Sequence, residues 1–173
     1  MIEVRPNRKL CILNIPSLAK KKNYAFFTLG INARMSQFES QIEQFKSMDY
    51  NIIAFDRIGC GYSDKPLTPE SYRESEIFAD LCKIWSDYIP QTSKLTNDIS
   101  NIIIIGHSYG TLQTMRLLNK YHLNSSTYGY NISGVILLGC IPFMNMDLLQ
   151  MGFIAGMIFK LPLFMIGKNY NIV

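Results

Sequence analysis

The segment of residues 102–110 constrains the fold more than any other part of the chain. It reads Ile-Ile-Ile-Ile-Gly-His-Ser-Tyr-Gly, and apolar residues at helical spacing follow it over Thr111–Tyr121. Four consecutive isoleucines are typical of a central parallel strand that is covered on both faces. A buried strand that passes through a glycine-flanked turn directly into a helix indicates a parallel α/β architecture.

The remaining chain shows the same alternation of strands and helices. Short apolar runs predict strands, and apolar residues three or four positions apart predict helices. The predicted strands are Lys9–Ile15, Tyr24–Leu29, Asn51–Phe55, Ile102–Ile105 and Val135–Leu138. The predicted helices are Ser36–Met48, Glu74–Ile89 and Thr111–Tyr121. The order β-β-α-β-α-β-α-β predicts an α/β fold with a mainly parallel sheet and flanking helices.

Length and composition limit the class of protein. A chain of 173 residues suits one domain, and no repeat or long Pro/Gly/Ser linker divides it. The residues are 48% hydrophobic and 17% charged, a balance that excludes intrinsic disorder. The formal net charge of +4 is too small to indicate nucleic-acid binding, so we expect no nucleic-acid partner.

Cysteine spacing and the N-terminus bear on the cellular compartment. No C-x-x-C pair occurs, which argues against a zinc ribbon or a thioredoxin-like site. The first residues, Met1–Pro6, lack the charged-then-apolar pattern of a signal peptide. We therefore expect a cytoplasmic protein with free thiols. The cysteines are Cys11, Cys60, Cys82 and Cys140.

Residues 151–167 are the strongest candidate for membrane contact. Lys160 is the only charged residue in this apolar stretch, and Pro162 interrupts it. Because spanning a bilayer takes about 20 apolar residues, the stretch predicts short helices that are buried or lie at a membrane surface.

The turn after the isoleucines carries the chemistry. Gly106-His107-Ser108-Tyr109-Gly110 fits G-x-S-x-G, the nucleophile elbow, in which a serine occupies a sharp strand-to-helix turn. Gly106 and Gly110 are needed because side chains there would clash. The turn lifts the Ser108 hydroxyl clear of the sheet and aims the Tyr109 N–H at a developing oxyanion. A chance match arises roughly once in twenty chains of this length, and the flanking strand and helix lower that rate.

Two further segments resemble the α/β-hydrolase superfamily. Residues 56–66, Asp-Arg-Ile-Gly-Cys-Gly-Tyr-Ser-Asp-Lys-Pro, resemble the D-x-R-G-x-G-x-S-D-x-P loop that follows the fourth strand in that family. Phe26–Gly30 lies where the family has its third strand and His-Gly oxyanion turn, although Leu29 replaces the histidine. The resemblance runs from about Leu10 to Leu138. It is greatest to the epoxide-hydrolase-like and abhydrolase-domain branch.

This resemblance implies a hydrolase that acts on an ester or other acyl bond of a small, apolar substrate. Ser108 is implied as the nucleophile, and the main-chain N–H groups of Ile31 and Tyr109 are implied as the oxyanion hole. We expect no cofactor, because the sequence contains no nucleotide-binding loop. We also expect no metal, because it contains no H-E-x-x-H motif.

A general base and an acid are missing from the sequence pattern. The chain has two histidines. His107 is interpreted as a packing residue, and His122 lies about 20 Å from Ser108 at the far end of the next helix. Residues 139–142 contain no carboxylate, and Asp147, the only later acid, is interpreted as an exposed residue.

Three hypotheses follow from this incomplete set. In the first, residues 1–142 form the N-terminal part of a hydrolase core and residues 143–173 begin an apolar cap. The last strands, the acid and the histidine then lie in chain beyond residue 173. In the second, the protein is a non-catalytic hydrolase-like protein that binds a ligand or partner. In the third, residues 151–167 contact a membrane surface. The sequence leaves the oligomeric state open.

Overall fold

A computed structural model describes residues 1–18, 22–90, 99–121 and 129–139, which build one six-stranded sheet with helices on both faces. The strands are β1 (Ile2–Arg5), β2 (Arg8–Ile15), β3 (Asn23–Thr28), β4 (Asn51–Asp56), β5 (Ser100–His107) and β6 (Tyr130–Leu138). The α-helices are α1 (Glu39–Ser47), α2 (Glu74–Tyr88) and α3 (Tyr109–Tyr121). Short 3-10 helices span Met35–Phe38 and Pro69–Tyr72.

The strand order β1-β2-β4-β3-β5-β6 places β4 and β3 in the centre of the described sheet, with β5 between β3 and β6. β3 runs parallel to β4 and β5, and β5 runs parallel to β6, whereas β1 and β2 join one edge in antiparallel pairing. Parallel neighbours need a crossover connection, which α1, α2 and α3 supply in turn. The predicted α/β class and mainly parallel sheet are confirmed.

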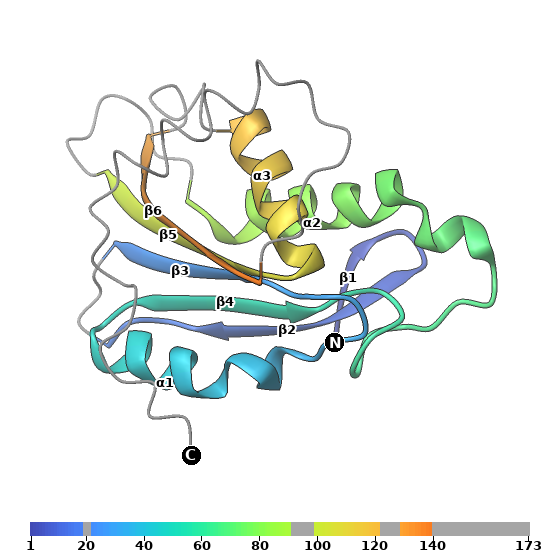
Figure 1. Cartoon of the computed structure of the whole chain (residues 1–173), viewed down its shortest axis with the longest axis horizontal. Helices are drawn as coiled ribbons and strands as arrows, with labels where there is room; N and C mark the ends of the chain where they lie inside the picture. Colours follow the sequence, from blue (N-terminus) through green and yellow to red (C-terminus); the bar gives the residue numbers. More distant parts are fainter. Residues whose placement is uncertain (19–21, 91–98, 122–128, 140–173) are drawn as a thin grey trace.

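The sheet carries a separate apolar layer on each face (Figure 1). α1 covers one face, and α2 and α3 cover the other. Phe26 and Phe27 are neighbours in β3 and therefore point to opposite faces. The Phe26 ring packs 5.1 Å from Trp85 of α2, and the Phe27 ring packs 5.1 Å from Phe38 beside α1.

β5 has the environment that its isoleucines predict. It lies between β3 and β6, and Ile102, Ile104 and Ile105 are at most 1% exposed. Its side chains are therefore packed against neighbouring elements on both faces of the sheet. The turn that follows His107 is thus fixed to the centre of the core.

Two strands differ from the sequence prediction. β1 was not predicted, because it has only four residues and pairs only with the adjacent β2. A tight turn at Asn7, whose φ is 60°, joins the two strands. β6 begins at Tyr130 rather than at Val135, because Tyr130 pairs with Ser100 and extends the ladder. The alternation of exposed Asn131 with buried Ile132 is the signal for that extension.

Other predictions fall on residues outside the described ranges. The cap at residues 143–173, the division at residue 142 and the apolar stretch at residues 151–167 all lie there and stay predictions. Within the described ranges, no helix has the length and apolar character that crossing a membrane requires.

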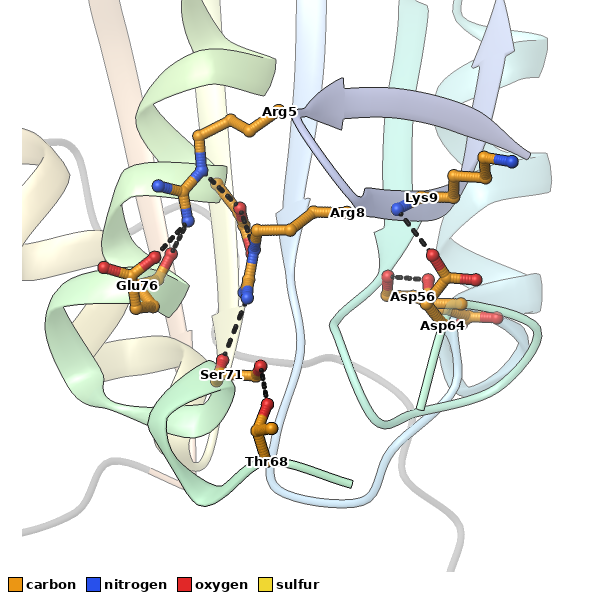
Figure 2. A network of polar contacts seen from close by, with 10 residues as sticks. Arg5, Arg8, Lys9, Asp56, Asp64, Thr68, Ser71 and Glu76 are labelled. Atoms are coloured by element: carbon orange, nitrogen blue, oxygen red, sulfur yellow. Dashed lines mark hydrogen bonds and ion pairs between the residues drawn. The ribbon is translucent and has the colours of Figure 1, made fainter. Parts of the chain in front are cut away.

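A charged network joins the β1–β2 hairpin to α2. Arg8 and Asp80 are buried, with 8% and 2% exposure, and form an ion pair. Arg5 Nε donates to the same carboxylate at 2.8 Å, and Arg5 Nη2 reaches Glu76 at 2.8 Å. Figure 2 shows Arg5 and Arg8 extending from the hairpin toward Glu76 and Ser71. Asp80 thus accepts hydrogen bonds from two guanidinium groups at a site with little access to water, and Glu76 supplies the second negative charge.

We expect Asp80→Asn to lower the free energy of unfolding by about 3 kcal/mol, because it leaves the buried Arg8 guanidinium without its counter-ion, whereas Arg5 keeps Glu76. Urea denaturation followed by circular dichroism measures the change. Asp87→Asn is the matched control, since the Lys83–Asp87 pair on the same helix is exposed and should contribute less than about 0.5 kcal/mol. Equal losses in the two variants would contradict a structural role for the buried pair.

Candidate active site

The carboxyl ends of β3, β4 and β5 meet at one edge of the sheet. Parallel neighbours necessarily end on the same side, and sites in open α/β sheets form at this edge. It brings together the turn after Thr28, the loop of residues 57–66 and the turn at Ser108. All three segments quoted for the sequence resemblance therefore converge in space.

Ser108 occupies a strained turn between β5 and α3. Its φ is 51°, and its N–H donates to the carbonyl oxygen of Leu138 at 2.9 Å. A Cβ on Gly106 would lie 2.6 Å from the Thr114 hydroxyl, and a Cβ on Gly110 would lie 2.3 Å from the Thr28 carbonyl oxygen. Only glycine fits at both positions, which accounts for the glycines of the motif.

Thr28 joins the end of β3 to the first turn of α3. Its buried hydroxyl donates to the carbonyl oxygen of Gly110 at 2.9 Å and lies 2.7 Å from the hydroxyl of Thr114. These bonds hold the helix against the sheet immediately after Ser108. No local sequence pattern predicts the roles of Thr28 and Thr114, because their pairing spans 86 positions.

The two predicted oxyanion residues belong to the turns at the ends of β3 and β5. Tyr109 is the first residue of α3, so its N–H has no acceptor within the helix and lies at the positive end of the helix dipole. Ile31 lies in the turn after β3 and is 60% exposed. A Cβ on Gly30, its neighbour, would lie 3.3 Å from the Ser108 Cβ, so this turn closely approaches the serine.

His107 packs away from a catalytic arrangement. Its ring meets Phe38 edge-on at 6.5 Å, and its Nδ1 is buried without a hydrogen-bond partner. A packing role agrees with the interpretation made from the sequence. His122, Cys140 and Asp147 lie outside the described ranges. The described part of the chain therefore presents Ser108 without an adjacent base.

Asp56 fixes two loops of the site to each other. Its carboxylate is 1% exposed and accepts hydrogen bonds from the N–H groups of Met35 at 2.8 Å and Tyr62 at 3.0 Å. A Cβ on Gly61 would overlap this carboxylate at 1.9 Å, so the loop can close around Asp56 only with glycine there. Farther along the loop, Asp64 accepts a hydrogen bond from Lys9 of β2 (Figure 2).

The Tyr109 side chain enters a polar cluster between α2 and α3. Its hydroxyl donates to Glu74 at 2.8 Å, and Gln113 donates to both Glu74 and Tyr109, at 2.6 and 2.8 Å. Arg116 completes the cluster with an ion pair to Glu74 at 2.6 Å. Burial, the hydrogen bond to Glu74 and the charge of Glu74 raise the pKa of Tyr109 to about 12.

The described residues offer little for metal binding. Cys11, Cys60 and Cys82 are free thiols. Within ranges 1–18, 22–90, 99–121 and 129–139, no group of three or more His, Cys, Asp or Glu side chains could hold a metal ion.

Comparisons with known proteins agree with this arrangement. A family model described as the alpha/beta hydrolase fold matches residues 26–170. An esterase from Exiguobacterium antarcticum is 22% identical, with a TM-score of 0.56 over 77% of this chain and 42% of the esterase. An epoxide hydrolase from Vigna radiata is 16% identical, with a TM-score of 0.59 over 81% of this chain and 37% of the hydrolase.

A third solved structure, the thioesterase domain from the curacin biosynthetic pathway, is 15% identical, with a TM-score of 0.62 over 91% of this chain and 52% of that domain. At these identities the likeness shows the fold alone. The chain spans between 37% and 52% of the length of these three structures. No curated protein matches the sequence.

We expect Gly110→Ala to lower the free energy of unfolding by about 1–3 kcal/mol, because the new methyl group must displace the main chain of Thr28. Chemical denaturation measures the loss. Gly134→Ala serves as the control, since its methyl group would meet the Ile103 side chain at 3.3 Å, and it should cost less than about 1 kcal/mol. A harmless Gly110→Ala variant would contradict the close approach at this turn.

We expect Glu74→Gln to move the pKa of Tyr109 from about 12 toward its ordinary value of 10, because a neutral amide no longer opposes phenolate formation. NMR titration of ¹³Cζ-labelled tyrosine measures the pKa of each phenol. Tyr24, whose pKa is raised by burial alone, is the internal control and should not move. An unchanged Tyr109 pKa would show that Glu74 does not contact it in solution.

The same pKa shift predicts how stability depends on pH. Because the pKa of Tyr109 is higher in the folded protein than the ordinary value of 10, folding favours the protonated phenol. The stabilising contribution is therefore present below pH 10 and is lost as the pH rises through about 12. Tyr109→Phe should reduce the fall in stability across this range, as measured by urea denaturation at several pH values.

Proposed function

Because the chain belongs to the alpha/beta hydrolase fold family, we propose that it acts as a serine hydrolase in which Ser108 attacks an ester or other acyl bond. Esterases, epoxide hydrolases and thioesterases are among the proteins of similar fold. An esterase-like or thioesterase-like reaction suits a serine nucleophile, because the serine oxygen can form an acyl-enzyme with a carbonyl carbon.

The backbone conformation of Ser108 is the observation that carries this proposal. Within the described residues, the other non-glycine residues with positive φ are Asn7, Asn32 and Asp49. Asparagine and aspartate tolerate this conformation because their short side chains can bond to the local main chain. Serine has less of that tolerance, and such strain is typical of functional sites. The conformation thus supports a role for the hydroxyl rather than a role in folding.

The proposed reaction uses the turn geometry. The Ser108 oxygen attacks the carbonyl carbon, and the carbonyl oxygen becomes an oxyanion. The N–H groups of Ile31 and Tyr109 donate to this oxyanion, and the N-terminus of α3 adds its positive dipole. The intermediate collapses to an acyl-enzyme as the leaving group takes the proton from Ser108. Water then hydrolyses the acyl-enzyme and restores the serine.

This reaction needs a base that takes the proton from Ser108 and an acid that orients the base. His107 is the single histidine of the described ranges, and its ring packs against Phe38. We propose that the histidine and the acid come from chain beyond residue 173. The chain spans only 37–52% of the length of the three solved structures, which is compatible with further chain that carries these two residues.

We propose a small apolar substrate, in agreement with the exposed apolar groups at this edge. Ile31 is 60% exposed and Tyr62 is 71% exposed, and they belong to the loops that follow β3 and β4. Exposed large side chains at the rim of a site can contact an apolar acyl group.

A second candidate is a non-catalytic protein that binds a ligand or partner at the same edge. The packing of His107 against Phe38 favours this candidate, because the described residues then supply no base for Ser108. The two candidates share the fold and differ only in whether the serine hydroxyl reacts. A chemical probe of Ser108 therefore separates them.

We expect a fluorophosphonate probe to label the full-length protein on Ser108, because the probe phosphorylates a serine that has an activating base and an oxyanion hole. Intact-protein and peptide mass spectrometry locates the adduct. Ser108→Ala should abolish labelling, whereas Ser133→Ala, on the accessible part of β6, should leave it unchanged. A folded protein that binds apolar ester analogues but is never labelled would overturn the hydrolase proposal in favour of the binding protein.

A further inference from the structure

The arginines of this chain fall into two groups. Every arginine lies within the described residues. One group forms ion pairs with carboxylates and consists of Arg5, Arg8, Arg73 and Arg116. The other group, Arg34 and Arg57, has no carboxylate partner in the described part of the chain. Both unpaired arginines follow strands β3 and β4, at the edge of the sheet that holds Ser108.

Arg57 is the more constrained of the two. Its guanidinium carbon lies over the Tyr109 ring, 4.7 Å from the ring centroid, and Nη2 lies 3.8 Å from the sulfur of Cys60. Its Nε is buried and has no hydrogen-bond partner. A guanidinium is contacted by an aromatic ring through its face, so the contact uses none of its N–H donors, and in Arg57 the Nε–H is left without an acceptor.

Tyr109 fixes Arg57 close to the reacting serine. Tyr109 directly follows Ser108, and Glu74 and Gln113 hold its hydroxyl. Arg57 packs on the same ring, so its guanidinium contacts the residue that directly follows the nucleophile. A group bound by Arg57 would thus belong to the same molecule that Ser108 attacks, or to one beside it.

Two carboxylates near Arg57 in the sequence or through Tyr109 are already engaged. Asp56 accepts the N–H groups of Met35 and Tyr62, and Glu74 pairs with Arg116. The loop of residues 57–66 contains two other charged side chains, Asp64 and Lys65. Lys65 donates to the carbonyl oxygens of Gly61 and Ser63 and adds positive charge. Within the described part of the chain, Arg57 thus has an Nε–H without an acceptor and no carboxylate partner.

We propose that Arg57 binds an anionic acid group of the substrate, a carboxylate or a phosphate, while Ser108 attacks an acyl bond elsewhere in the same molecule. The planar guanidinium can donate two parallel hydrogen bonds to either kind of anion. The inference rests on the proposed function and narrows it, since the substrate then carries an acid group in addition to an apolar part.

The test compares two ligands of the same shape that differ in charge. N-Butylsuccinamate carries a carboxylate, and N-butylsuccinamide carries a neutral amide in its place. Isothermal titration calorimetry with the full-length protein should give at least about tenfold tighter binding of the succinamate, because a charge-assisted bidentate contact is lost in the amide. Inorganic phosphate should compete with the succinamate if the site accepts any oxyanion, and should not compete if it selects carboxylate.

Variants assign the selectivity to Arg57. Arg57→Met should reduce the affinity ratio of the two ligands to about one, and Arg57→Lys should keep part of it because the charge remains. Arg73→Met is the matched control, because it removes an exposed, paired guanidinium and should leave the ratio unchanged. A ratio near one in the unmodified protein, or an unaltered ratio in Arg57→Met, would overturn the proposal.

NMR of the unmodified protein provides a test that does not depend on how the variants fold. The Nε–H signal of Arg57 can be assigned because it is missing from the spectrum of Arg57→Lys, or by selective labelling. This signal should shift when the succinamate is added and should not shift when the succinamide is added. An Nε–H signal that does not shift when the succinamate is added refutes the proposal. Neither measurement requires turnover. Anion binding can therefore be observed even if the fluorophosphonate probe does not label Ser108, and labelling can be observed even if no anion binds.

Discussion

The close approach of the end of β3 to the start of α3 is the contact on which the candidate site depends. The Thr28 hydroxyl bonds to the Gly110 carbonyl and to Thr114, and the glycines on either side of Ser108 leave room for that approach. Without this contact the helix could not begin directly at the strand end, and Ser108 would relax from its positive φ. Packing thus maintains a conformation that serine alone does not favour.

A second set of contacts builds the surroundings of the serine. Asp56 is a buried carboxylate that receives main-chain N–H groups from the loops after β3 and β4. The Glu74–Gln113 pair holds the Tyr109 side chain, and Arg57 packs on its ring. Residues from three loops are thereby coupled through fixed polar groups. Preorganised groups of this kind suit a site that binds charge, because they need no rearrangement when the charge arrives.

Local patterns were sufficient to predict the parts of the fold with strong periodicity. The isoleucine run became the buried strand β5, and Phe38, Ile42 and Phe45 became the buried face of α1 and its preceding turn. The hairpin strand β1 was missed because a four-residue strand pairing with its neighbour carries little periodicity. The Arg8–Asp80 pair was missed as well, because its members are 72 positions apart. Ion pairs of that kind leave no spacing signal.

The sequence alone determined the α/β class, the position of Ser108 and the glycines beside it, because each depends on residues within a few positions of one another. The family membership followed from the same motifs and is supported by the match over residues 26–170. Only the tertiary structure decided that Thr28 anchors α3, that His107 packs against Phe38, and that Arg57 lies on Tyr109 without a carboxylate partner in the described part of the chain. Those relations arise where strand ends from distant parts of the chain converge, and a linear sequence does not display that convergence.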